Sequence, residues 1–462
     1  MRFSVDETLV NPASDERGTE RGAFYMTRSN QKPPGLDDIF NRRGSPHAIA
    51  GEAIALVDGN AHLSLSNALG QSKASMAALY VHIPFCPSRC LSCDHLTIVE
   101  HDQKVMDRYL AHLHNELALM AGQSRVPLQI NRIHIGGGSP NYLDDVQLAR
   151  LMASLHSAFD VTAYADISME INPRRTSRSQ LDLIRGLGVT HLHLEVRDVD
   201  ANVQSELGRT QSFSLLEDVF SVARDLKFAT INMDLVFGLP GQTSQSIKNS
   251  VALIAELAPD MLVCQQYTRR PQQFPHQTAL DHDAMPSLAE KLAIFNAVAV
   301  GLESEGYEWI GLNAFVRPGH ALSEAQAKDT LRYGAFGYSE NEVSQVLGAG
   351  LGAVSEVGDV VAQNFVDIDA WQIAIGQGRL ATQVLIETSE FEVARRSVMR
   401  RLMCNAEVPI SSVEEADVLT LLESLENQGY TEQRDAFVYL TELGRMALPH
   451  FWSDSSPRFR WL

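Results

Sequence analysis

Short apolar segments alternate with amphipathic helical segments between about residues 79 and 267. Residues 145–159 show the helical pattern, with Leu148, Leu151, Met152 and Leu155 on one face. The strand candidates are LYVHIPF, RIHIGGG, DISMEINP, HLHLEV, TINMDLVFGLP and DMLVCQQY. Six consecutive strand–helix units predict an α/β fold with a parallel sheet, closed into a full or partial barrel.

The segments on either side of this region have a different pattern. We expect residues 1–75 to form an N-terminal arm or leader, because they are rich in turn-forming residues and lack a firm strand pattern. The barrel is predicted over 76–310 and an extension of it over 311–375. Residues 376–462 combine helical segments with a short strand pair, which predicts a mostly helical, winged-helix-like accessory domain.

Composition limits the classes of partner. Hydrophobic residues make up 45% of the chain and charged residues 21%, as in ordinary globular proteins. No apolar run approaches the roughly 20 residues that span a bilayer, and the first residues are polar, so we expect a cytoplasmic protein. The net charge of −19 argues against binding to nucleic acid or to an anionic membrane surface. It leaves a small-molecule substrate open, and we expect a monomer.

Three of the five cysteines lie within eight residues of one another, in the stretch YVHIPFCPSRCLSCDHL. Cys86, Cys90 and Cys93 have C-x3-C-x2-C spacing in a loop after a predicted strand. A zinc site normally has four ligands, which Asp94 and His95 would have to complete. Thiolates also hold iron–sulfur clusters, and three of them leave one iron of a [4Fe-4S] cluster open to another ligand. Cys264 and Cys404 are expected to be buried apolar residues.

Other polar and glycine residues lie where predicted strands end. Gly136, Gly137 and Gly138 allow a ligand to approach the backbone, although a tight turn would also explain them. Glu170 and Asp234 are acidic residues near strand ends that face the barrel interior. Such acids are costly to bury unless they are paired or functional.

The cysteine spacing after the first barrel strand resembles the radical S-adenosylmethionine (SAM) superfamily. With IHIGGGSPNYL, ISMEINPR, INMDLVFGLPGQT and GDVVAQN, the sequence resembles the oxygen-independent coproporphyrinogen III oxidases and their relatives. The resemblance implies a partial (β/α)6 radical SAM barrel and a [4Fe-4S] cluster on Cys86, Cys90 and Cys93. It also implies SAM as a second cofactor and an electron donor such as flavodoxin or ferredoxin.

The resemblance also assigns residues to SAM. It places Tyr80 beside the cluster-bound SAM, and it gives contacts with SAM to Gly137, Gly138, Ser139, Glu170, Arg209 and Asp234. The further positions that it assigns to SAM binding are Arg197, Thr268 and Val354. No catalytic residue is assigned.

Several positions depart from the family pattern. Asp94 and His95 follow Cys93 where the family has a fourth cysteine two residues after the third, and Ser92 replaces an aromatic residue. The other departures are Arg197 and Phe336 for glutamines, Thr268 for an alanine, and Asn313-Ala314 for an Asp-His pair. Several of these positions surround the second SAM that the oxidases bind, so the number of SAM molecules and the substrate stay open. Arg174, Arg175, Arg269, Arg270 and Arg317 are candidates for binding a polycarboxylate, or are solvated surface residues.

The resemblance implies that the chain decarboxylates the propionates of coproporphyrinogen III to vinyl groups, giving protoporphyrinogen IX. The alternatives are a related radical SAM reaction, such as methyl transfer or haem-ring opening, and a haem-binding chaperone with His95 as axial ligand. The remaining alternative is a structural protein whose fold is held together by a bound zinc ion.

Overall fold

The barrel sheet is formed by the six predicted strands. The structure, a computed structural model, describes residues 55–56, 61–125, 127–334, 336–340, 345–446 and 448. The six strands are β2 (Met76–Ile83), β5 (Gln129–Gly137), β6 (Asp160–Ile171), β7 (His191–Arg197), β8 (Thr230–Phe237) and β9 (Met261–Gln266). They are neighbours in this order and all run parallel, which confirms the predicted barrel.

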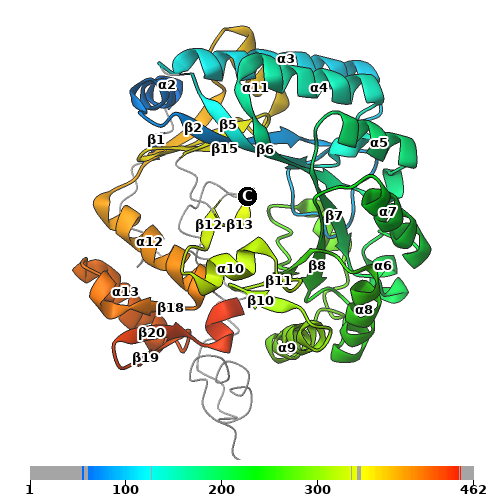
Figure 1. Cartoon of the computed structure of the whole chain (residues 1–462), viewed down its shortest axis with the longest axis vertical. Coiled ribbons are helices and arrows are strands. Elements are labelled where there is room, and N and C mark those ends of the chain that lie inside the picture. The colour runs from blue at the N-terminus through cyan, green and yellow to red at the C-terminus, as the bar shows by residue number, and fades with distance from the viewer. Residues whose placement is uncertain are drawn as a thin grey trace, which may run out of the picture. The chain divides into compact units, whose positions relative to one another are not determined.

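Helices cover the outer face of the curved sheet (Figure 1). They are α3 (Gln103–Gln123), α4 (Asp145–Ala158), α5 (Arg178–Gly186), α6 (Ala201–Glu206), α7 (Phe213–Asp225), α8 (Ser244–Leu257) and α9 (Leu288–Ser304). Side chains fix several starts. Asp144 and Gln147 form a reciprocal capping box at α4, and Ser287 and Glu290 form one at α9.

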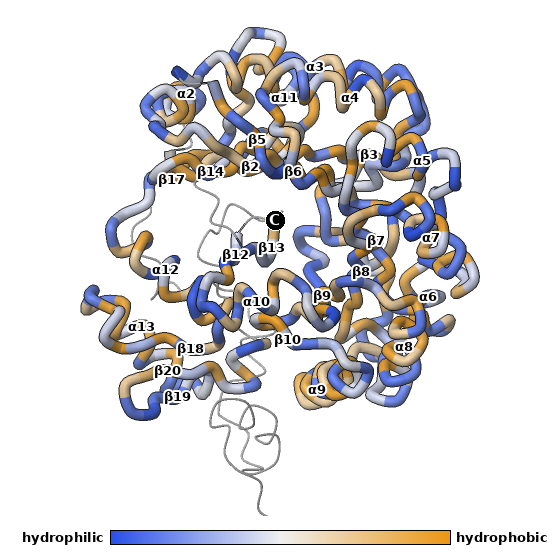
Figure 2. Tube along the Cα trace, in the orientation of Figure 1, coloured by the Kyte–Doolittle hydropathy of each residue, from blue (hydrophilic) through white to orange (hydrophobic). Residues whose placement is uncertain are grey.

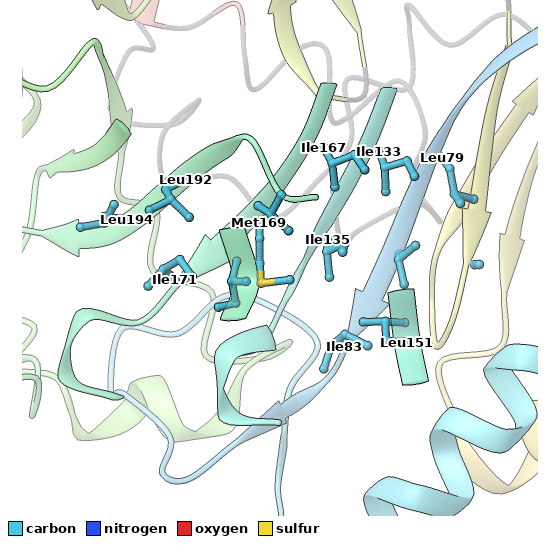
Figure 3. Close-up of a cluster of buried hydrophobic side chains, with 14 of the residues drawn as sticks. Leu79, Ile83, Ile133, Ile135, Leu151, Ile167, Met169, Ile171, Leu192 and Leu194 are labelled. Carbon is cyan, nitrogen blue, oxygen red and sulfur yellow. The ribbon is translucent and has the colours of Figure 1, made fainter. Parts of the chain in front are cut away.

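The main core lies between the strands and these helices. Figure 3 shows Ile133, Ile135, Met169 and Leu192 from adjacent strands, close to Leu151 of α4. These apolar residues alternate along each strand with polar residues that face the opposite side. In Figure 2 the strands and the inner sides of the helices are accordingly largely hydrophobic, whereas most loops are hydrophilic.

The sheet continues beyond the six strands at both edges and reaches thirteen strands within the described residues. On the β2 side lie β14 (Gln345–Ala349), β15 (Val354–Val357), β16 (Val360–Asn364), β17 (Thr382–Glu387) and β1 (Ala55–Leu56). On the β9 side lie β11 (Ala314–Val316) and β10 (Glu308–Ile310). The remaining elements here are α10 (Ala321–Ala327), α11 (Ile368–Gly376) and the separate hairpin β12 (Arg332–Gly334)–β13 (Gly337–Ser339).

Part of the range predicted as a leader belongs to the folded body. Helix α2 (Ala61–Gln71) buries Leu65 and Leu69 in the main core. Residues 1–54 and 57–60 lie outside the described residues, so the prediction of an arm is not tested there.

The C-terminal elements follow the predicted order of helices and then a hairpin. They are α12 (Glu390–Asn405), β18 (Glu407–Pro409), α13 (Ala416–Asn427), β19 (Thr431–Arg434) and β20 (Phe437–Leu440). The three strands form a small antiparallel sheet in the order β18-β20-β19. Strand β17 lies within the predicted accessory range but pairs with β16 of the main sheet, so the accessory unit follows Glu387 in the structure. In the part of the chain described here, no helix combines the length and apolarity needed to cross a membrane.

Candidate active site

The cysteine loop follows β2 and is closed by two short strands. β3 (Phe85–Cys86) pairs in parallel with β4 (Ile98–Val99), so both ends of the loop are held together. Cys86 is half-buried, whereas Cys90 and Cys93 are buried. The loop is therefore a structured insertion at the carboxyl end of a barrel strand, where ligand sites in parallel barrels are built.

Each thiol has polar neighbours from other parts of the barrel. Cys86 Sγ lies 3.7 Å from Ser139 Oγ, at the end of the glycine segment. Cys90 Sγ accepts from Arg209 Nη1 at 3.4 Å and from Arg174 Nη2 at 3.8 Å. Two guanidinium groups from distant parts of the chain therefore lie beside the sulfur of this candidate cluster ligand.

The three thiols also influence one another. Burial raises the pKa of Cys86 to about 12, and the charges of Glu195, Cys93 and Cys90 add to this rise. Burial acts in the same direction on Cys93, but its hydrogen bond to His95 and the charge of Arg197 outweigh burial, so its pKa is lowered. Cysteine sulfurs whose negative charges repel one another in this way are expected where a cationic iron–sulfur cluster would neutralise those charges.

The donor set fits a [4Fe-4S] cluster. Within the described residues no three His, Cys, Asp or Glu side chains are grouped closely enough to hold a single metal ion. A mononuclear zinc site gathers its ligands around one atom. In an iron–sulfur cubane each cysteine binds a different iron, so its sulfurs lie further apart. Cys86, Cys90 and Cys93 would hold three of the four irons.

The glycine segment at the end of β5 is packed so closely that side chains would not fit. A Cβ on Gly136 would lie 2.5 Å from Glu170 Oε1, and one on Gly138 would lie 2.7 Å from the Pro84 carbonyl oxygen. Gly137 has φ +115°, which favours glycine. The segment therefore brings backbone N–H groups beside the cysteine loop without side chains in between.

Glu170 is held at the end of β6 by this glycine segment. Its Oε2 accepts from the Gly137 N–H at 2.9 Å, and its Oε1 lies 3.1 Å from His134 Nε2. Burial opposes ionisation, but the hydrogen bond and charge of His134 lower the pKa of Glu170 to about 2. Glu170 is thus a fixed carboxylate facing the barrel interior, suited to bind hydroxyl or ammonium groups of a ligand.

Tyr80 is linked to the cysteine loop through His82. His82 Nε2 donates to the Leu96 carbonyl at 2.9 Å, so its Nδ1 accepts from the Tyr80 hydroxyl at 3.0 Å. Burial lowers the pKa of His82 to about 4, which keeps the ring neutral. His82 is therefore a packed, hydrogen-bonded residue that orients Tyr80.

Three alternate residues of β7 pair with polar groups around the site. His193 Nε2 lies 2.8 Å from Asp234 Oδ1, and Glu195 Oε2 lies 3.5 Å from Arg209 Nη2. Arg197 Nη2 lies 3.6 Å from Asp94 Oδ1. Strand β7 thus carries a row of ion pairs that runs from the barrel interior to the cysteine loop. Arg197, Arg209 and Asp234, all predicted to contact SAM, belong to this row.

Two further predicted positions differ in their surroundings. The buried hydroxyl of Thr268 has no hydrogen-bond partner within the described residues, so it is available to a ligand. Val354 packs in a small apolar cluster with Val361, Val384 and Ile386. Its contact with SAM stays a prediction. Cys264 and Cys404 are buried, as expected.

Phe336 lies at the tip of the β12–β13 hairpin and reaches into the barrel. Its ring centroid lies 6.0 Å from that of His134 and 6.4 Å from that of Tyr80. On another side the Arg132 guanidinium lies 5.5 Å from its centroid. In Figure 1 the hairpin lies near the centre of the barrel opening. Phe336 therefore contributes an apolar ring to the interior.

Comparison with known proteins places these features in one family. Residues 80–254 match the Radical SAM superfamily. The chain is 32% identical over 339 residues to the oxygen-independent coproporphyrinogen III oxidase of Pseudomonas aeruginosa, covering 73% of this chain and 74% of that protein. It is 31% identical to the Escherichia coli oxidase, covering 80% and 83%. The chain belongs to the oxygen-independent coproporphyrinogen III oxidase family.

The solved structure of E. coli coproporphyrinogen III oxidase, a radical SAM enzyme, is similar in fold. The TM-score is 0.78 at 30% identity, covering 85% of this chain and 93% of that one. As a member of this family the chain is a radical SAM protein that binds a [4Fe-4S] cluster and SAM. Its glycine segment, Glu170 and the cysteine loop fit one SAM beside the cluster.

The residues around the family's second SAM fit that ligand less well. Arg197 replaces a glutamine, and its guanidinium is already paired with Asp94. Phe336 replaces another glutamine with a ring that cannot form an amide hydrogen bond, and it packs on Tyr80 and His134. Both positions thus differ from the family in hydrogen-bonding capacity, and the number of SAM molecules per chain stays a prediction.

Several residues of the site were not predicted from the sequence. Glu195 and His193 were not singled out, although HLHLEVR places polar residues at every second position of a buried strand. Arg174 was read as a possible surface residue, yet it reaches Cys90. His276 and Gln277, which bind the Cys93 carbonyl, lie more than 180 residues from it in the chain, and no local pattern marks them.

Proposed function

We propose that the chain catalyses the oxygen-independent oxidative decarboxylation of coproporphyrinogen III to protoporphyrinogen IX. The observation that supports this most is the similarity to the oxidases over most of their length, together with a cysteine loop, glycine segment and Glu170 that fit the cluster and SAM. When bound, the cluster and SAM supply a 5′-deoxyadenosyl radical. A propionate side chain would lose a hydrogen atom to this radical, which becomes 5′-deoxyadenosine, and one electron to a separate one-electron acceptor. Release of CO2 would then leave a vinyl group.

The residues of the chain bind, orient and enclose the reactants. Arg209 and Arg174 donate to the sulfur of Cys90, and Glu170, held by the Gly137 N–H, forms a fixed polar edge for SAM. Tyr80 and Phe336 line the interior with rings that exclude water from a reactive intermediate. We expect a low-potential donor such as flavodoxin or ferredoxin, a cytoplasmic location and a monomer.

A second candidate is a related radical SAM reaction on another tetrapyrrole, such as methyl transfer or haem-ring opening. The observation that favours it is the altered interior, where Phe336 and the Arg197–Asp94 pair replace the family's polar groups. This candidate keeps the cluster and SAM but changes the acceptor.

An anaerobic assay separates these candidates. The reconstituted, reduced protein is mixed with SAM and coproporphyrinogen III, and the products are followed by mass spectrometry. Loss of two carboxyl groups, with 5′-deoxyadenosine formed in proportion, is the expected result. Deoxyadenosine without decarboxylation would favour the second candidate, and an intact cluster that leaves SAM uncleaved would favour a haem chaperone.

A further inference from the structure

The segment around Cys93 is bound by groups from distant parts of the chain. The Cys93 carbonyl accepts from His276 Nε2 at 2.8 Å and from Gln277 Nε2 at 3.0 Å. The Leu91 N–H donates to the Leu207 carbonyl at 3.0 Å. Arg197 Nη1 donates to both the carbonyl and the hydroxyl of Ser92 at 3.2 Å. The position of the third cysteine therefore depends on these tertiary contacts as well as on bonds within its own loop, such as that from the Cys93 N–H to the Cys90 carbonyl at 3.1 Å.

Arg197 holds two neighbours of Cys93 at once. One of its terminal nitrogens bonds Ser92, and the other lies 3.6 Å from Asp94 Oδ1. The second oxygen of Asp94 lies 3.7 Å from Arg270 Nη2. A planar guanidinium with donors on both sides suits this double contact, whereas a lysine ammonium is a single point of charge.

The backbone at Arg197 is shaped for this contact. Arg197 has φ +71° and lies at a register shift between Glu195 and Arg197 in the β7–β8 pairing. The other non-glycine residues of the described chain with positive φ end helices or turn a hairpin: Lys227, Ala258, Asp329, Ala406 and Asp435. Strain of this kind persists where the surroundings fix it, and it is concentrated at functional sites.

The buried position makes the charge of Arg197 effective. Arg197 is 6% exposed, so water screens the charge of its guanidinium little. The charges of Cys90 and Cys93 are among those that act on its guanidinium. Positive charge near a cluster favours its reduced form, so such a residue raises the reduction potential.

We propose that Arg197 is a positioning residue for the iron–sulfur cluster, acting through Ser92 and Asp94. It holds the segment that carries Cys93, and its charge, balanced by Asp94, sets the reduction potential of the cluster. The proposal concerns the cluster alone and does not depend on which substrate the enzyme takes.

The test is a redox titration of the reconstituted full chain, followed by electron paramagnetic resonance, without substrate. Arg197→Gln should lower the midpoint potential and broaden the signal of the reduced cluster. Asp94→Asn should raise the potential, because it removes the opposing charge. Arg197→Lys should give a potential between those of Arg197→Gln and the wild type. Arg178→Gln is the matched control, since Arg178 is an exposed arginine paired with Asp225.

The outcomes are decisive in either direction. Equal potentials and signals in Arg197→Gln and Arg178→Gln would overturn the proposal. So would shifts of Arg197→Gln and Asp94→Asn in the same direction, since both would then report only a damaged loop. If Arg197→Gln fails to hold iron, Asp94→Asn and Arg197→Lys carry the test, and an unchanged potential in both overturns it.

Discussion

The Gly137 N–H donates to Oε2 of Glu170 at 2.9 Å, which joins the glycine segment at the end of β5 to the carboxylate at the end of β6. The bond can form because Gly136 has no side chain: a Cβ there would lie 2.5 Å from Glu170 Oε1, whereas a Cβ on Gly137 would meet His82. The polar edge that would bind SAM therefore depends on the absence of a Cβ atom on Gly136 as much as on the carboxylate of Glu170.

Gly136→Ala should therefore weaken SAM binding. The new Cβ would lie 2.5 Å from Oε1 of Glu170 and would push the carboxylate away from His134 and Gly137. We expect the dissociation constant of SAM to rise about tenfold or more, equivalent to about 1.4 kcal/mol. Gly122→Ala in α3 is the control, because a Cβ there meets nothing within 4 Å. Equal SAM affinity in both variants would show that the edge does not bind SAM.

Replacing any of the three loop cysteines with alanine should abolish the cluster. Each thiolate would hold a different iron, so each replacement would remove one of the three protein ligands of the cluster. Iron and sulfide content and the visible absorption of the reconstituted protein measure this loss. Cys264→Ala should keep full cluster content, because Cys264 is a buried core residue. Retained cluster in a Cys90→Ala variant would contradict the ligand assignment.

The stability of the protein should fall as pH rises from about 6.5 to 9 through His193. Burial opposes its protonation, but the charges of Asp234, Glu170 and Glu195 outweigh burial and raise the pKa of His193 to about 9. In this window the folded chain binds a proton that the unfolded chain has lost, so the contribution is complete below pH 6.5 and is lost by pH 9. It amounts to about 1–3 kcal/mol.

Chemical denaturation at several pH values compares the wild type with His193→Gln. The variant should be less stable at pH 6 and should lose most of the alkaline decrease. An identical pH profile in the two proteins would contradict the His193–Asp234 pair.

The reconstituted protein should bind about one SAM per chain. Arg197 is engaged by Asp94, and Phe336 offers no hydrogen bond, so the second site lacks two of its polar partners. Equilibrium dialysis with labelled SAM, normalised to cluster content, measures the number. A value near two would show that Thr268 and the backbone suffice for a second molecule.

The sequence predicted the barrel strands because short segments that alternate polar and apolar residues are bounded by turns, as in RIHIGGG and HLHLEV. It did not predict that β14 would pair with β2, since the register partners Val81 and Ala349 lie 268 positions apart in the chain and no local pattern encodes that pairing. The short strands β10, β11 and β1, each of two or three residues, were likewise too brief to have a period.

The sequence predicted those parts of the candidate site whose residues lie close together in the chain. Cys86, Cys90 and Cys93 are marked by their spacing and the glycine segment by its composition. The partners of Arg197 and Arg209 were not predicted, because an ion pair depends on how β7 faces the cysteine loop across the barrel. A register shift at the end of β7 sets that orientation. The one sign of it in the sequence is that Arg197 stands where the family has a glutamine.

The measurement that tests the central claim most directly is the ratio of CO2 released to 5′-deoxyadenosine formed from coproporphyrinogen III, under anaerobic conditions with a chemical reductant. The proposed decarboxylation predicts one CO2 for each deoxyadenosine and two of each for every protoporphyrinogen IX. It predicts neither product with a Cys93→Ala variant. Deoxyadenosine formed without CO2, or CO2 released by the Cys93→Ala variant, would contradict it.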